Sequence, residues 1–293
     1  YLTATEQPNP EWGKRGCILY ASEDLKRWRE EAYLFNIKSI DKDAWYRDEW
    51  EAPEIKRIGG KYYLTFNSRN NQLRPYKKMG FGVAVADEIT GPYTILNPEK
   101  PLAYGANFTL FEDHDGQIYA YWDLDGRIYG AKLDINAVEF ITEPKEILGP
   151  ESLGEHFRFL DAPFVMRRDD TYYMISSSFY SGYIEKVRYV TSQQSPLGPW
   201  NYADNNPLMS FIESEASTVL NMPYSRGYTF APPTQVIFNN HIFKGPGGKW
   251  YIAYHSSEKY SEPYLLLEPV KFDKAGRIQL PGNKEMQHKV KLD

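Results

Sequence analysis

An internal repeat is the feature of this sequence that most constrains its fold. Four aromatic-rich segments, each entered through a turn, have the pattern of one strand copied along the chain: "GKYYLTF" (60–66), "GQIYAYW" (116–122), "DTYYMIS" (170–176) and "GKWYIAY" (248–254). The opening "YLTAT" matches the tail "YLTF" and predicts the end of a fifth copy. A second element recurs after the copies, as in "LYASEDLKRW" (19–28) and "VAVADEITGPY" (83–93). Such repetition predicts an array of similar structural units.

The spacing and composition of these copies indicate the fold class. Turns rich in Gly, Pro, Asn and Asp separate short strands of β-branched and aromatic residues, and no long amphipathic helix pattern occurs. Short strands grouped in units of roughly 50 residues are typical of a β-propeller. We therefore predict an all-β, five-bladed β-propeller with four-stranded antiparallel blades, forming a single domain over residues 1–293. The first blade is expected to be incomplete at the N-terminus. A β-sandwich is the alternative, but it does not predict a long-range repeat.

Charge, hydropathy and cysteine content exclude several classes of protein. The formal net charge is −5, and Lys and Arg are scattered without a basic run, so we expect no nucleic-acid partner. The apolar runs are strand-sized and the N-terminus has no signal-like pattern, so we expect no membrane span and no export signal within this chain. The single Cys17 excludes an internal disulfide and a cysteine zinc site, and it is expected to be a small buried hydrophobe. Nothing indicates an obligate protein partner.

Acidic residues stand in front of an Ala-Pro step at the heads of two predicted strands. They are Glu51 in "WEAPEI" and Asp161 in "LDAPFV", each eleven residues before the same position of an aromatic copy. Asn107 lies at the same offset before a third copy. In a propeller the first strand of each blade lines the central channel, so the heads of these strands meet at one mouth. The offset predicts that Glu51, Asn107 and Asp161 share one pocket, with Trp50 on its wall.

The same offset extends the pattern to the other blades. In the fifth blade it falls on Asn239, and His241 follows two residues later on the same strand face. In the first blade it falls about twelve residues before Tyr1, outside this chain. Further candidates for contacts with a sugar ring are the aromatic residues Trp50, Tyr228 and Phe230, because aromatic faces suit the apolar faces of sugars.

Each candidate also has a structural interpretation. A lone acid at a strand entry can simply accept backbone N–H bonds, but two acids at equivalent positions favour a functional site. Asn107 is a structural amide or a hydrogen-bonding partner for a sugar hydroxyl. His241, between apolar residues, is a core histidine, or it binds the substrate and lies near a metal ion.

Several segments resemble glycoside hydrolase family 43. They are "EAPEIKRIGGKYYLTF", "LDAPFVMRRDDTYYMISS", "LGPW" and "NNHIFKGPGGKWYIAYHSS", and the resemblance covers nearly the whole chain. It implies a five-bladed propeller with a general base Asp at the head of the first blade, a pKa-tuning Asp in the third and a general acid Glu in the fourth. Asn107 stands at the third position here and Asp161 at the fourth. The resemblance also implies a periplasmic or secreted protein that requires no cofactor, with a calcium ion near the propeller axis close to His241.

The chemistry of such a site explains why it needs carboxylates. Inverting hydrolysis needs one carboxylic acid to protonate the leaving oxygen and one carboxylate, roughly 6.5–9.5 Å away, to activate water. The acid must keep a raised pKa, which a neighbouring carboxylate would provide, so either Asp161 or Glu51 is the acid.

We therefore predict an inverting, exo-acting glycosidase that degrades an oligosaccharide or polysaccharide at arabinofuranoside, xyloside or galactoside linkages. The alternative is a catalytically impaired carbohydrate-binding propeller, because Asn107 in place of Asp fits a loss of catalysis. A protein-interaction propeller would have no reason to place acids at equivalent strand heads.

Overall fold

The computed structural model describes residues 1–5, 16–153, 159–180, 184–204, 209–210, 235–258, 264–280, 288–289 and 291–292. Within these ranges the secondary structure is almost entirely β, with three short 3₁₀ helices: η1 (Ile37–Ser39), η2 (Pro150–Leu153) and η3 (Pro246–Gly248). The contacts group the chain into two compact units. The first comprises Tyr1–Ile147 with Lys291–Asp293, and the second comprises Leu148–Val290. That the whole chain forms one domain stays a prediction.

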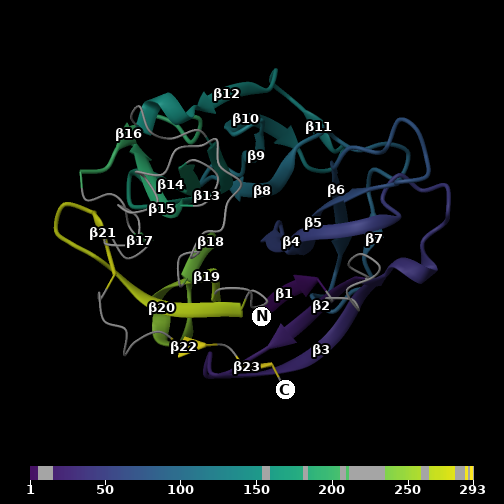
Figure 1. Ribbon diagram of the computed structural model, residues 1–293, viewed down its shortest axis with the longest axis horizontal. Helices are drawn as coiled ribbons and strands as arrows, with labels where there is room; N and C mark the ends of the chain where they lie inside the picture. The colour runs from purple at the N-terminus through teal and green to yellow at the C-terminus, as the bar shows by residue number, and fades with distance from the viewer. Residues whose placement is uncertain are drawn as a thin grey trace, which may run out of the picture. The chain divides into compact units, whose positions relative to one another are not determined.

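The first sheet belongs to the first unit and joins the two ends of the chain (Figure 1). Its order is β1-β2-β3-β23, made of β1 (Leu2–Thr5), β2 (Gly16–Ala21), β3 (Arg27–Asn36) and β23 (Lys291–Leu292). β23 pairs with β3 in parallel, whereas the other pairings in this sheet are antiparallel. β1 pairs with β2 as the second strand of a blade pairs with the third, which the match of "YLTAT" to "YLTF" predicted. Among the described strands none pairs with the other edge of β1. That the first blade is incomplete stays a prediction.

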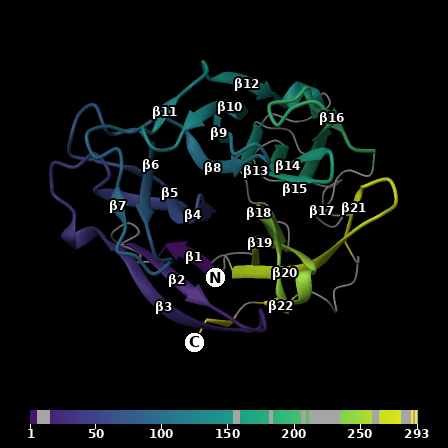
Figure 2. The same cartoon turned by 180° about the vertical axis from the view of Figure 1, so that it is seen from behind.

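The second and third sheets complete the first unit. The second runs in the order β4-β5-β6-β7, with β4 (Asp48–Ile58), β5 (Lys61–Arg69), β6 (Gly80–Ala86) and β7 (Thr94–Ile95). The third contains β8 (Ala106–Glu112), β9 (Ile118–Leu124), β10 (Arg127–Asp134) and β11 (Glu139–Phe140), and β12 (Lys145–Leu148) also pairs with β10. Figure 2 shows both sheets from behind, with the strands of each side by side in chain order.

The second unit contains the fourth and fifth sheets. The fourth contains β13 (Phe159–Arg168), β14 (Thr171–Tyr180), β15 (Ile184–Ser192) and β16 (Asn201–Tyr202), with β17 (Met209–Ser210) also on β15. The fifth contains β18 (Gln235–Lys244), β19 (Trp250–Glu258), β20 (Tyr264–Phe272) and β21 (Ile278–Gln279), with β22 (His288–Lys289) also on β20. The protein is thus a five-bladed β-propeller, which confirms the predicted fold. Each blade is built on a path of four strands, and these are antiparallel apart from the β3–β23 pair.

The four aromatic copies form the second strand of each blade, namely β5, β9, β14 and β19. Buried and half-buried residues alternate along β19 from Tyr251 to His255, whereas in β5 and β9 six consecutive residues are buried. Both faces of such a strand pack against other blades, so its apolar residues run on without the alternation of a half-exposed strand. This is why the repeat was visible as uninterrupted aromatic and apolar runs.

Aromatic rings fill the core of the first unit. Trp50 stacks on Phe66 with ring centroids 3.9 Å apart and lies 4.7 Å from the ring of Phe35. The Trp50 indole N–H donates to the backbone oxygen of Tyr46 over 2.8 Å. Cys17 lies in the same cluster with 0% of its surface exposed, so its expected role as a small buried hydrophobe is confirmed. No helix among the described ranges is long and apolar enough to cross a bilayer.

Candidate active site

The inner strands β4, β8, β13 and β18 share one irregularity at their heads. Each changes register there, between Glu51 and Glu54, Ala106 and Thr109, Asp161 and Phe164, and Phe238 and His241. Within each irregularity one residue has a positive φ: Ala52 (45°), Asn107 (51°), Ala162 (49°) and Asn239 (51°). Such a bulge bends the strand and re-aims the side chains around it. The propeller therefore builds the same re-aiming device into four of its blades.

The registers correct the predicted equivalence of Asn107 with the two acids. In the β4–β5 and β13–β14 hairpins, four residues lie between the two partners of an equivalent pair next to the turn. In the β8–β9 and β18–β19 hairpins, five residues lie between them. The extra turn residue makes the eleven-residue offset wrong by one in the third blade. Ala106 is the counterpart of Glu51 and Asp161, whereas Asn107 matches the alanines that follow those acids.

Glu51 and Asp161 do occupy the same position in their respective blades. Each is half-buried and directly precedes a positive-φ alanine and a proline. Each also pairs across the hairpin with a buried polar residue, Glu51 with Asn67 and Asp161 with Ser177. The local structure thus presents the two carboxylates in the same way, Glu51 in the first unit and Asp161 in the second.

A second set of polar residues lies opposite the strand heads, and it was not among the residues predicted from the sequence. It comprises Asn67, Asp123, Ser177 and His255, which pair with Glu51, Ala106, Asp161 and Phe238 respectively. Two of them tie one blade to the head of the next. The Asn67 side-chain oxygen accepts from Phe108 N over 3.4 Å, and the Ser177 hydroxyl accepts from Asn239 N over 3.1 Å. The signal in the sequence was a polar residue at the same place in every aromatic copy.

Asn107 has a direct side-chain partner in this second set. Its amide nitrogen donates to the Oδ2 atom of Asp123 over 2.8 Å. Asp123 is only 5% exposed, so the third blade holds a buried carboxylate beside its strand head. This carboxylate was also absent from the sequence-based candidates.

The inner strands of the first unit carry a further acid, Glu54. Its Oε2 atom accepts from the Thr109 hydroxyl over 2.5 Å, and its Oε1 atom lies 2.7 Å from the Lys56 ammonium. Because Thr109 belongs to β8 and Glu54 to β4, this contact joins the inner strands of the second and third blades. Glu54 therefore has a bonded, structural environment.

The aromatic candidates have different outcomes. Trp50 is 0% exposed and enclosed by rings of its own unit, so its expected contact with a sugar is wrong. It faces the core because the register change at Glu51 turns adjacent residues in different directions. Tyr228 and Phe230 lie outside the described residues.

His241 follows the bulge of β18 and packs against an aromatic ring of the fourth blade. Its ring centroid lies 4.1 Å from that of Phe164. Calcium prefers six to eight oxygen ligands. No group of three His, Cys, Asp or Glu side chains that could hold a metal occurs among the described residues. A calcium ion near His241 stays a prediction.

The fourth blade also contains a buried cation. Arg188 on β15 is 6% exposed, donates from Nε to the Ser178 hydroxyl over 3.1 Å and bonds the Tyr202 hydroxyl. Desolvation lowers the pKa of this guanidinium from its ordinary value, and Tyr202 opposes that shift. Positive charge is therefore fixed by hydrogen bonds within the blade that carries Asp161.

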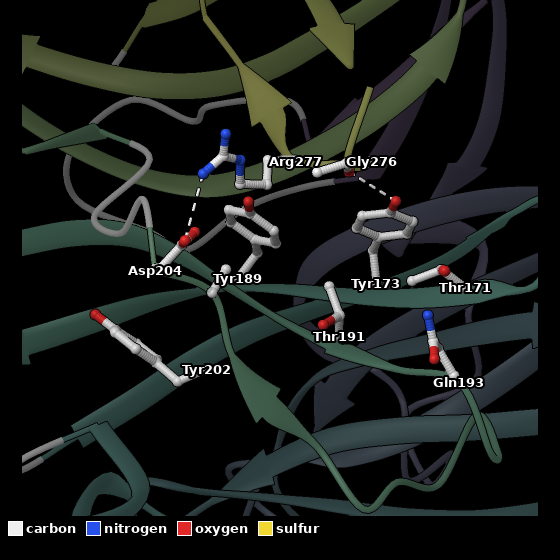
Figure 3. Close-up of a pocket in the computed structure, with 11 residues that line it drawn as sticks. Thr171, Tyr173, Tyr189, Thr191, Gln193, Tyr202, Asp204, Gly276 and Arg277 are labelled. Carbon is white, nitrogen blue, oxygen red and sulfur yellow. Dashed lines mark hydrogen bonds and ion pairs between the residues drawn. The ribbon is translucent and has the colours of Figure 1, made fainter. Parts of the chain in front are cut away.

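A cavity of about 360 Å³ lies at the other end of the fourth blade, near the β13–β14 turn (Figure 3). The Tyr173 hydroxyl donates to the Gly276 backbone oxygen over 2.7 Å, and the Arg277 guanidinium lies 3.3 Å from the Asp204 carboxylate. None of the predicted site residues lines this cavity. Its contacts join β14 to the turn that leads into β21, so we assign it a structural role between the fourth and fifth blades.

Comparison with known proteins agrees with this architecture. The family model described as glycosyl hydrolases family 43 matches residues 1–278. The chain is 24% identical over 274 residues to extracellular endo-α-(1→5)-L-arabinanase 2 of Bacillus subtilis, covering 83% of this chain and 53% of that protein. It is 27% identical over 151 residues to a β-xylosidase of Xylanibacter ruminicola, covering 48% of this chain and 43% of that protein.

Solved structures show the same fold. An endo-1,4-β-xylanase of Bacteroides thetaiotaomicron superposes with a TM-score of 0.75 at 19% identity, covering 99% of this chain and 92% of that one. The endo-arabinase of the same organism gives a TM-score of 0.68 at 22% identity, covering 88% and 87% of the two chains. This chain spans about half the length of the curated relatives it matches. Together with the five blades, the match over residues 1–278 shows that the chain belongs to glycosyl hydrolases family 43.

Proposed function

We propose that the protein is an inverting glycosidase acting on a polysaccharide or oligosaccharide with arabinose, xylose or galactose linkages. The observation that carries the proposal is the placement of Glu51 and Asp161 at one repeated position, each before a bulge that re-aims the strand. The names of the relatives, an arabinanase and a β-xylosidase, favour arabinose and xylose over galactose.

In this proposal Asp161 is the general acid. It donates its proton to the glycosidic oxygen as the bond to the anomeric carbon breaks. A second carboxylate removes a proton from the water that attacks that carbon from the opposite face, which inverts its configuration. Glu51 is the alternative acid, because its bulge and its partner across the hairpin are arranged in the same way.

The variant Asp161→Asn tests this assignment in the full-length protein. Loss of a positioned acid lowers kcat by about 10²- to 10⁴-fold on substrates whose leaving group needs a proton. Aryl glycosides with a strongly acidic phenol need little protonation and should be affected much less. Glu51→Gln should spare both substrates if Asp161 is the acid and should show the selective loss if the role belongs to Glu51.

A matched control is Asp170→Asn, at the exposed turn that ends the same hairpin. It should retain wild-type rates on both substrates. Equal losses on the two leaving groups in Asp161→Asn would show that Asp161 does not donate the proton.

The mode of attack is tested by the products. The exo-acting mode predicted from the sequence should release monosaccharide from the start of the reaction. NMR should show that the first anomer formed has the opposite configuration to the glycoside, which identifies inversion. The names of two relatives carry the word "endo". Early appearance of oligosaccharides from arabinan or xylan would therefore show that the protein is endo-acting and not exo-acting.

A carbohydrate-binding propeller without catalysis is the second candidate. Asn107, at the position where the family resemblance implies an Asp, favours it. It predicts saturable binding of oligosaccharides by calorimetry, with no turnover of any aryl glycoside. Measurable turnover that is lost in Asp161→Asn or Glu51→Gln excludes it.

We also propose that the protein acts in the periplasm or outside the cell. The supporting observation is the name of the Bacillus relative, which describes that protein as extracellular. Fractionation of cells expressing the full-length gene tests the location directly, and recovery only from the cytoplasm would contradict it.

A further inference from the structure

We propose that Asn107 and Asp123 act as one anionic unit at the head of the third blade. In this unit Asp123 orients the Asn107 amide so that its oxygen accepts a hydrogen bond from a sugar hydroxyl, and Asp123 supplies the negative charge. Asp123 is thus a positioning residue. The inference rests on the proposed function, because it assigns the sugar contact to the same group of strand heads.

The bulge of β8 brings the two side chains together. Ala106 pairs with Asp123 across the hairpin, and regular pairing resumes only at Thr109. Asn107 lies inside this irregularity with a φ of 51°, a conformation that Asn tolerates better than most residues. From there its amide nitrogen reaches Asp123 over 2.8 Å.

The chemistry of Asp123 fixes the orientation of the amide. An ionised carboxylate only accepts hydrogen bonds, so the NH₂ end of Asn107 must face it. The other end of the amide is then its carbonyl oxygen, which is an acceptor. A neutral amide facing Asn107 would permit either orientation. Asp123 therefore makes Asn107 present an acceptor oxygen, as the Asp expected at this position would.

The charge of Asp123 sets it apart from its counterparts in the other blades. Asn67 and Ser177 occupy the matching places as neutral residues, and both act as acceptors of a backbone N–H. A neutral residue thus suffices for a tether at this position. Burying a carboxylate is costly unless it is hydrogen-bonded, and Asp123 is 5% exposed. A role at the strand head accounts for that charge.

Reciprocal exchange of the two side chains tests the unit in the full-length protein. Asp123→Asn keeps the size and hydrogen-bonding capacity of the side chain but removes the charge and the fixed amide orientation. We expect kcat/KM to fall about 10- to 100-fold, as for a lost electrostatic contact, with the midpoint of thermal unfolding little changed. The double variant Asn107→Asp with Asp123→Asn restores one carboxylate and one amide, and it should recover kcat/KM to within about threefold of wild type.

The single variant Asn107→Asp supplies a readout that does not depend on activity. It places two carboxyl groups in contact, so one stays protonated and its folded-state pKa rises. The folded protein then binds more protons than the unfolded chain, and the variant should lose stability relative to wild type as the pH rises from about 5 to about 8. Thermal unfolding across this range measures the effect.

Asp125→Asn, an exposed turn position two residues further on, is the matched control and should leave kcat/KM and stability unchanged. Full activity in Asp123→Asn, or no recovery in the double variant, would overturn the inference. So would the absence of added pH dependence in Asn107→Asp. If the wild type turns over no glycoside, the proposed function fails, whereas the stability of Asn107→Asp still tests whether the two side chains form a unit.

Discussion

At the scale of single residues, backbone conformation decides which side chains can stand at the strand heads. All four inner strands with described heads place a residue at positive φ directly after the head, and two of these residues are Asn107 and Asn239. Asn is favoured there because its short polar side chain tolerates left-handed backbone. The structural interpretation of Asn107 and its proposed role in the site are therefore compatible, since the bulge selects the residue type and also aims its side chain.

Cys17 provides a prediction at the same scale. Burial raises the pKa of its thiol from 9.0 to about 12. Only thiolates react readily with thiol reagents, so native protein near pH 8 should label very slowly and unfolded protein rapidly. Quantifying free thiol with a chromogenic disulfide reagent checks this result. Rapid labelling of native protein would show that the first blade opens often.

The raised pKa of Cys17 also predicts a dependence of stability on pH. The folded protein keeps the thiol protonated where the unfolded chain has lost the proton, so unfolding becomes easier as the pH rises above 9.0 toward about 12. The stability of wild type minus that of Cys17→Ala isolates this contribution from the titration of other groups. The difference should be constant below about pH 8 and should decrease above it.

At the scale of elements, hairpin length sets the register of each strand head. One additional residue in the β8–β9 turn moves Asn107 out of line with Glu51 and Asp161. Contacts between successive blades then hold the heads in place, as the Asn67 and Ser177 side chains do. At the opposite end of the fourth blade the Tyr173 hydroxyl makes a similar link to the backbone of Gly276.

Tyr173→Phe tests that link between blades. Tyr173 is 2% exposed, and its loss leaves the Gly276 oxygen without this donor, so stability should fall by about 1–2 kcal/mol. Chemical denaturation measures the change. Tyr129→Phe is the matched control, because the Tyr129 hydroxyl has no hydrogen bond to the described residues, and it should change stability by less than about 0.5 kcal/mol. Equal effects in the two variants would show that the hydrogen bond of Tyr173 to Gly276 does not stabilise the protein.

At the scale of the whole molecule, the first sheet depends on the two ends of the chain. Lys291 and Leu292 pair in parallel with Arg27 and Trp28, more than 260 residues away in the sequence. β2, which carries Cys17, lies on the other side of β3 in the same sheet. An edge strand protects the hydrogen bonds of its neighbour, so β23 should slow the opening of this blade.

Deleting residues 291–293 tests that role. We expect the rate at which a thiol reagent labels Cys17 in the native protein to rise about tenfold. Such a rise in the population of the open state corresponds to a loss of about 1.4 kcal/mol. Deleting only Asp293 is the control and should leave the rate unchanged. Unchanged labelling after the longer deletion would show that β23 does not limit the opening of the first sheet.

The sequence by itself determined the architecture of this protein. Aromatic-rich strands repeat at the same place in four of the blades, and this pattern can be read from the sequence without knowing which residues pack together. The same pattern located Glu51 and Asp161, because their hairpins have turns of equal length. The burial of Cys17 was also predicted from the sequence, in which it is the single cysteine.

Only the tertiary structure decided which side chains meet. A bulge and one extra turn residue changed the register of Asn107, and counting along the chain cannot detect either. The pairing of Asn107 with Asp123 and the burial of Trp50 depend on packing between strands distant in the sequence. Local patterns fix which strands form, whereas register and packing across strands fix which atoms come into contact, and the chemistry of the site depends on those atoms.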